Sequence, residues 1–412
     1  MINIDPEASA ARWLLSAEAV RTQAHLILEA AERDELQHFR YQGNRLDAAA
    51  GYVADTIRDN YPSLEIPFHA RWRHFVVDGS DRWAISPPAA GDDPLERARI
   101  RIDLAVISVL LDAGAGAQWC YRDHQTGQDL ARSEGLAIAS FDAFMDGGFS
   151  ADPSQPLRAD GPALEALDEA ALANAFQVGG DNPLAGLSGR TSLLNRLGHA
   201  VDHHPMYFSS TERRIGHLAD FFVSAARNGA LPAATVLTTL LDALGSIWPG
   251  RLAMADHDLG DTWHHPAARR DDTANGLVPF HKLSQWMAYS LIEPLEELGL
   301  NVTEPNDLTG LAEYRNGGLM IDTGLLTPKH DGVLGAPHQA GSEIIVEWRA
   351  LTVALLDRLA AKVRDIFGKA PEDMPLAAVL EGGTWAAGRR IAREKRPDGA
   401  PPLNIISDGS VF

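Results

Sequence analysis

Cysteine is almost missing from this sequence of 412 residues, because Cys120 is the single example. One thiol cannot form a disulfide within the chain, which is typical of proteins in a reducing compartment. No apolar run approaches the roughly 18–20 residues that cross a membrane. The first residues also lack the basic stretch and apolar core of a signal peptide. We therefore expect a cytoplasmic protein without a membrane partner.

Basic residues are scarce relative to acidic ones. Lysine and arginine together number 36, against 56 aspartates and glutamates, which leaves a formal net charge of −20. Partners with a phosphate backbone need a basic surface, so we expect no nucleic acid partner. A hydrophobic content of 45% is ordinary for a globular protein with a large core.

Strand signals are few, and neither an internal repeat nor a glycine-rich dinucleotide fingerprint is present. One hairpin is predicted, at 66–77 followed by Asp78-Gly79. Helical periodicity dominates elsewhere. The predicted helices are 6–33, 96–114, 191–204, 234–248, 281–298 and 342–368. The pattern predicts a mainly α fold with a small β-hairpin element.

Two stretches have no clear period. Residues 150–163 are rich in Pro, Asp and Ser, and they predict a boundary between an N-terminal part, 1–150, and a helical body, 164–412. One continuous domain is the alternative. Residues 249–278 would be a long loop, and such loops are usually functional or disordered. We favour function, because this loop carries Trp263, three histidines and several aspartates.

The helix predicted at 281–298 carries two kinds of face. Its apolar face should belong to the core, while Lys282, Gln285 and Tyr289 lie at helical spacing on another face. That polar stripe is either a solvated edge or the wall of a ligand site. Pro294 predicts a kink or a helix boundary.

A dense polar cluster follows at 313–318, with the sequence EYRNGG. Asp307 to Thr309 resemble a helix start, which would place Glu313 one turn further in and near Lys282. The cluster is either a structural Glu–Arg pair beside a glycine turn or a buried carboxylate tuned by its neighbours as acid, base or electrostatic stabiliser.

Metal and anion sites have weaker patterns. His257, His264 and His265 offer metal ligands, but adjacent histidines do not converge easily on one ion, and we expect neither a metal nor a cofactor. Asp261 in the same loop could instead serve as a single catalytic carboxylate. Arg190 lies in a loop that feeds a helix N-terminus, where it could hold a phosphate, or the loop could simply cap the helix.

Several long motifs together resemble the uracil catabolism protein 4 family of pyrimidine breakdown. They run from about residue 66 to the C-terminus. The matching motifs are PFHARWRHF, DLAVISVLLDAGAGAQWCY, RSEGLAIASF, NPLAGLSGRTSLL, HKLSQWMAYSLIEPLEELG, LTGLAEYRNGGL, VEWRALTVALLD and EGGTWAAGRR. The family implies a role in pyrimidine degradation, a pathway thought to pass through a ribosylurea-type intermediate.

The order of motifs is also similar to that of the queuosine salvage glycosylases, which are helical, resemble DNA glycosylases in fold and cleave an N-ribosidic bond without a metal. Their Lys and Gln on one helix correspond to Lys282 and Gln285. Their acidic residue before Tyr-Arg is Asp, where this chain has Glu313. That family also places an aspartate shortly before the Lys/Gln helix, and its nearest counterpart here is Asp261. The resemblance also implies substrate-binding roles for Tyr314, Arg315, Glu347, Arg349 and Trp385.

The first hypothesis is therefore an N-ribosyl hydrolase that cleaves a ribosylurea, with or without a 5′-phosphate, to urea and the sugar. Asp261 and Glu313 would be catalytic. Further predicted substrate contacts are Arg71, His74, Trp119 and Arg190. A metal-dependent amidohydrolase that uses residues 256–265 and a non-catalytic pathway partner are the alternatives. The sequence predicts no oligomeric state.

Overall fold

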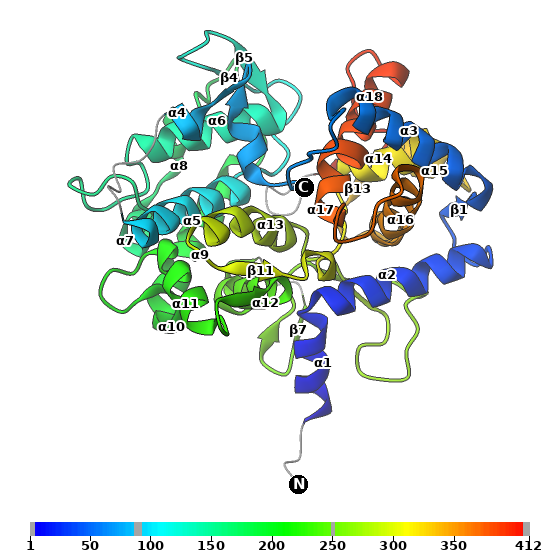
Figure 1. Ribbon diagram of the computed structural model, residues 1–412, viewed down its shortest axis with the longest axis horizontal. Coiled ribbons are helices and arrows are strands. Elements are labelled where there is room, and N and C mark those ends of the chain that lie inside the picture. Colours follow the sequence, from blue (N-terminus) through cyan, green and yellow to red (C-terminus); the bar gives the residue numbers. More distant parts are fainter. Residues whose placement is uncertain (1–4, 86–92, 249–251, 407–412) are drawn as a thin grey trace. The chain divides into compact units, whose positions relative to one another are not determined.

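The computed structural model describes residues 5–85, 93–248 and 252–406 (Figure 1). The chain forms two compact units, each built from separate segments. Of the described residues, the first unit comprises 5–69, 252–285 and 304–406, and the second comprises 70–85, 93–248 and 286–303. The predicted boundary at 150–163 lies inside the second unit. Helix α13 (Lys282–Glu297) begins in the first unit and continues in the second.

The first unit is built on two long helices, α2 and α16, which pack against each other. Its helices are α1 (Pro6–Leu14), α2 (Ala17–Glu32), α3 (Leu46–Asn60), α14 (Tyr314–Asp322), α15 (Gly332–Gly335), α16 (Glu343–Phe367), α17 (Leu376–Ala378) and α18 (Ala386–Lys395). Short 3-10 turns lie at η1 (Gly43–Arg45) and η5 (Pro305–Asp307), and η6 (Val379–Trp385) is a π-helix.

The second unit is also helical. Its α-helices are α4 (Arg82–Ile85), α5 (Pro94–Leu110), α6 (Arg132–Met145), α7 (Gly161–Ala166), α8 (Glu169–Ala175), α9 (Leu187–His203), α10 (Pro205–Phe208), α11 (Leu218–Ala225) and α12 (Ala233–Leu244). The 3-10 turns are η2 (Arg71–Phe75), η3 (Ile215–His217) and η4 (Gly245–Ile247).

Strands occur as small pairs. In the first unit β1 (Phe39–Tyr41) pairs with β12 (Leu326–Pro328), β7 (Ala253–Met254) with β8 (His257–Asp258), β9 (Thr262–His264) with β10 (Leu277–Pro279), and β13 (Pro337–Gln339) with β14 (Asn404–Ile406). In the second, β2 (Val76–Val77) pairs with β3 (Ser80–Asp81), β4 (Cys120–Arg122) with β5 (Asp129–Ala131), and β6 (Ala230–Pro232) with β11 (Asn301–Thr303). The prediction of a mainly α fold with small β elements is confirmed.

The long predicted helix at 6–33 is two helices. Ser16 breaks the pattern, since its side chain accepts a hydrogen bond from the Ala19 N–H at 3.1 Å and caps α2. Pro294 lies inside α13, which runs on to Glu297, so a helix boundary at Pro294 is wrong.

The predicted hairpin at 66–77 is correct only at its tip. Asp78 and Gly79 both have positive φ, at 51° and 75°, which matches a two-residue hairpin turn between β2 and β3. The preceding segment forms η2 instead of a strand. The reason is tertiary, because the Arg71 N–H donates to Ser290 Oγ at 2.9 Å on α13, which occupies the backbone that a strand partner would need.

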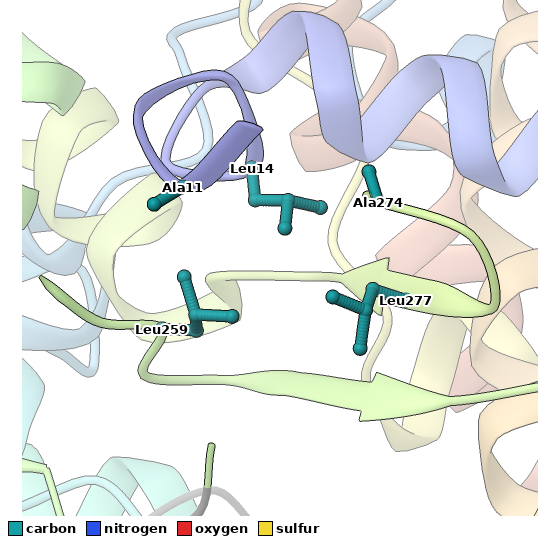
Figure 2. Packing of buried hydrophobic residues seen from close by; sticks show 5 residues of the cluster. All are labelled: Ala11, Leu14, Leu259, Ala274 and Leu277. Carbon is teal, nitrogen blue, oxygen red and sulfur yellow. The ribbon is translucent and has the colours of Figure 1, made fainter. Parts of the chain in front are cut away.

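Residues 252–277 are far from structureless, because two hairpins organise them and α1 covers them. Figure 2 shows Ala11 and Leu14 of α1 facing Leu259, Ala274 and Leu277 in a buried apolar cluster. The Gln23 amide on α2 adds a hydrogen bond of 2.6 Å to the Leu277 carbonyl. The N-terminal helices thus hold the segment that carries Asp261.

Among the described residues, every helix is too short or too polar to pass through a bilayer.

Candidate functional site

The carboxylate of Asp261 is a tightly held charged group in the first unit. Asp261 precedes β9 and is only 6% exposed. Arg349 on α16 donates to both oxygens, from Nη1 at 2.8 Å and Nη2 at 2.7 Å. Trp263 Nε1 donates at 2.7 Å, and the Lys282 backbone N–H donates at 3.2 Å from the start of α13. Four donors therefore fix the carboxylate in place.

Electrostatics keep Asp261 ionised. Burial alone would raise its pKa, but the charge and hydrogen bonds of Arg349, with those of Trp263 and Lys282, outweigh burial and lower the pKa to about 2. Arg349 is itself fully buried, and its guanidinium carbon lies 4.0 Å from the Phe280 ring centroid. The result is a buried pair that is charged at neutral pH.

The free energy of unfolding should depend on pH through the lowered pKa of Asp261. The folded-state value of about 2 lies below the ordinary 3.8, so the stabilisation is full above pH 3.8 and is lost as pH falls through about 2. Its size is about 2 kcal/mol, roughly halved by pH 3. Denaturant unfolding at pH 6 and pH 3 should show the stability gap between wild type and Asp261→Asn narrowing. A gap that does not change with pH would contradict the assigned ionisation.

Gln285 is a buried positioning group. Its Nε2 donates to Thr309 Oγ1 at 2.6 Å, and its Oε1 accepts from the Thr309 N–H at 3.1 Å. This reciprocal pair ties the first turn of α13 to the segment before α14. Gln285 and Tyr289 are both fully buried, so the solvated-edge interpretation of the polar stripe is wrong for them. Sequence reasoning did not identify Thr309 as the partner.

Glu313 is the N-cap of α14, so the predicted helix start at 307–309 is wrong. Its two oxygens accept from the Asn316 N–H at 2.5 Å and the Arg315 N–H at 2.7 Å. This places a half-buried carboxylate at the positive end of a helix dipole. Tyr314 follows it, and burial and then the Glu313 charge raise the pKa of this phenol above its ordinary value. Tyr314 therefore stays protonated and can act as a donor.

The glycines of the EYRNGG cluster have a packing reason. A Cβ on Gly317 would lie 2.1 Å from Trp348 Cζ2, so only glycine lets α14 approach α16 this closely. The Arg315 side chain donates from Nη1 to the Gly399 carbonyl at 2.9 Å. These contacts hold Glu313 and Tyr314 to the rest of the first unit.

Trp385 lines an open pocket of about 630 Å³ in the first unit. The Arg389 guanidinium carbon lies 5.4 Å from its ring centroid. In the same wall, Glu381 Oε2 lies 2.6 Å from His69 Nδ1, a buried pair that sequence reasoning missed. Both Glu381 and Trp385 belong to the π-helix η6, a type of element often found at functional sites. A stacking role for Trp385 stays a prediction.

Three predicted contacts lie in the second unit, each held by its own neighbours: Arg71, His74 and Trp119. Arg71 donates to Ser108 Oγ at 2.7 Å and pairs with Asp112 at 2.8 Å. The His74 ring packs edge-on against Trp286 at 5.4 Å. Trp119 Nε1 donates to the Phe176 carbonyl at 2.9 Å. These positions are buried, and substrate contact by any of them stays a prediction.

Arg190 is a structural residue in this geometry. Its guanidinium is fully buried, which lowers its pKa to about 10. It donates to backbone carbonyls of Leu111, Ala113, Gly114 and Ala185. The contacts offer no support for the predicted phosphate role.

Metal-ligating side chains converge at a place that the sequence did not indicate. His264 is exposed and His265 is buried at the end of β9, so the two side chains do not share a ligand position. Instead, His38, Glu343 and Glu347 bring ligand atoms within 4.8 Å of one another in the described part of the first unit. His38 and Glu343 lie about 300 residues apart in the chain, and no local motif links them.

These features define a mainly helical protein with a buried Asp–Arg pair in its first unit that is ionised at neutral pH. The chain belongs to the family described as a protein of unknown function (DUF1688), which matches residues 13–412. It is similar to Protein urg3 of Schizosaccharomyces pombe, with 38% identity over 408 residues, covering 97% of this chain and 98% of the relative. It is also similar to Uracil catabolism protein 4 of Lachancea kluyveri, with 37% identity over 440 residues and the same coverage.

The family predicted from the sequence motifs is thereby confirmed. The more distant likeness to queuosine salvage glycosylases stays a prediction, as does the glycosylase-like character of the fold.

Proposed function

We propose that this protein acts in pyrimidine catabolism and hydrolyses the N-ribosyl bond of a ribosylurea-type intermediate, with or without a 5′-phosphate. The name of one relative, Uracil catabolism protein 4, supports the pathway. The observation that carries the reaction is the buried Asp261 carboxylate, held ionised by Arg349 and two further donors, Trp263 and the Lys282 backbone N–H. A fixed anion in a dry environment suits the positive charge that develops on a sugar during C–N cleavage.

In the proposed reaction, water adds to the anomeric carbon and the carbon–nitrogen bond breaks. The departing nitrogen takes a proton, so the products are urea and ribose or its 5-phosphate. Four donors occupy the Asp261 oxygens, so we assign this residue electrostatic stabilisation and positioning rather than activation of water.

Glu313 is the second proposed carboxylate. Each of its oxygens accepts one backbone N–H and keeps a further acceptor position. It can therefore orient and deprotonate water, while the protonated Tyr314 beside it can donate to the leaving nitrogen. Lys282 and Arg315 complete the proposed substrate contacts of the first unit.

A chain of contacts connects the two carboxylates. Asp261 holds the first N–H of α13, and Gln285 one turn later holds Thr309. Beyond Thr309, the Asn316 side chain donates to the Leu311 carbonyl at 3.1 Å, and its N–H donates to Glu313. Such a network supports a preorganised site, because each polar group is fixed by the next.

Purified protein incubated with ribosylurea and with its 5′-phosphate should release free urea and the sugar in equal amounts. Parallel incubation with an N-carbamoyl amino acid tests the amidohydrolase alternative, which would release ammonia and carbon dioxide. Absence of urea from both ribosyl forms would overturn the proposal. Absence of turnover with all three substrates would favour the non-catalytic partner.

A further inference from the structure

Glu347 is a buried carboxylate that is only half satisfied. It lies on α16 and is fully buried. Its Oε1 accepts from the backbone N–H groups of His38 at 3.1 Å and Phe39 at 2.7 Å. Its Oε2 is buried without a hydrogen-bond partner among the described residues. A buried carboxylate oxygen that makes no hydrogen bond is costly, so a cationic ligand is the simplest way to satisfy it.

His38 presents a nitrogen to the same place. Its Nδ1 lies 2.9 Å from His330 Nε2, a contact that can fix the ring orientation and leave Nε2 with its lone pair. His38 Nε2 is buried and also makes no hydrogen bond within the described residues. It lies 3.5 Å from Glu343 Oε1. Glu343 and Glu347 are four residues apart on α16, so both side chains can reach His38.

His265 supplies a supporting contact. Its Nδ1 accepts the Ala267 N–H at 3.2 Å, which assigns the ring proton to Nε2. That nitrogen faces Glu347 Oε2 at 3.4 Å. The His265 ring can therefore fix the orientation of the Glu347 carboxylate, as groups that contact metal ligands without binding the metal commonly do.

We propose that the first unit binds one divalent transition-metal ion through His38 Nε2, Glu343 and Glu347 Oε2. These ligand atoms all lie within 4.8 Å of one another. Ligands about 2.0–2.2 Å from a tetrahedral zinc ion are separated by about 3.3–3.6 Å, and the 3.5 Å between His38 and Glu343 matches this.

The ligand chemistry selects the class of metal. One imidazole and two carboxylates suit zinc, manganese or iron, whereas calcium and magnesium prefer oxygen alone. Three protein ligands leave a coordination position open, as in catalytic sites. The Glu343 side chain is 41% exposed, which provides a route of entry from solvent. The proposal stands independently of ribosylurea hydrolysis.

The test uses the full chain without a histidine tag. Metal content is measured by elemental analysis on protein as isolated, and binding is measured by calorimetry with Zn²⁺ and with Mn²⁺ after chelator treatment and dialysis. We expect one ion per chain for at least one of the two metals. Glu347→Gln and Glu343→Gln should each weaken binding by at least about 100-fold.

The matched control is Glu212→Gln. Glu212 also lies beside a histidine, but the two ring nitrogens of His217 face different carboxylates, Glu212 at 3.0 Å and Asp220 at 3.1 Å, so they cannot chelate one ion. This variant should bind metal as wild type does. Because Glu343 is partly exposed, Glu343→Gln keeps the test valid even if Glu347→Gln fails to fold.

Two results would overturn the proposal. One is the absence of stoichiometric binding, which would make the group an ordinary His38–Glu343 ion pair. The other is binding that persists in both glutamate variants. His199→Ala then tests the competing site, because His199 and His203 lie one turn apart on α9 with ring centroids 3.8 Å apart; loss of binding in this variant would assign the ion to that site. Neither measurement involves the ribosyl substrate, so failure of urea release would leave this test unaffected.

Discussion

Glu313→Gln is expected to slow urea release from the ribosyl substrate by about 10²–10⁴-fold with little change in stability. The glutamine oxygen can still accept an N–H at the start of α14, so the cap is largely kept. What disappears is the negative charge and the ability to take a proton from water. The loss should therefore fall on kcat rather than on folding.

Steady-state kinetics of urea release, with circular dichroism as the folding check, measure this effect. Glu372→Gln is the matched control, because it is the same substitution at an exposed position of the first unit. It should retain wild-type rates. If Glu313→Gln works within threefold of wild type, Glu313 is only a helix cap and the water-activating role belongs elsewhere.

Asp261→Asn is expected to reduce the free energy of unfolding by about 3–5 kcal/mol, because it leaves the fully buried Arg349 without its counter-charge. An asparagine oxygen can replace only part of the two bonds that Arg349 donates. Denaturant unfolding followed by tryptophan fluorescence suits this test, since Trp263 Nε1 donates to the carboxylate being changed.

Asp271→Asn is the control, since the same substitution there alters an exposed residue of the same segment. A second comparison uses Arg349→Met alone and combined with Asp261→Asn. Removing both partners should reduce the free energy of unfolding by less than the sum of the two single changes, and we expect the difference to be roughly 2 kcal/mol. Strict additivity of the two costs would show that the pair is not coupled.

The best sequence predictions were those that depend on local periodicity. The apolar stripe of 342–368 predicted α16, which runs from Glu343 to Phe367. The helical pattern at 96–114 and 191–204 likewise predicted α5 and α9 within a few residues. Such patterns are local, because a helix buries one face at each turn wherever the chain goes.

Prediction was weaker where contacts with distant segments determine the conformation of the backbone. Residues 71–75 have strand-forming residues but form η2, because their first N–H bonds to Ser290. Residues 252–277 carry no period, yet packing against α1 and the amide of Gln23 orders them into hairpins. Both outcomes depend on partners more than 200 residues away in the chain.

The sequence by itself determined the helical class, the family and the residue types available for chemistry, since composition, periodicity and long motifs are properties of the chain. Only the tertiary structure decided which of those residues meet. Arg349 reaches Asp261 from 88 positions away, and His38 approaches Glu343 and Glu347 from about 300. Burial then sets the charge of each group, because ionisation depends on the donors and solvent that folding places around a carboxylate.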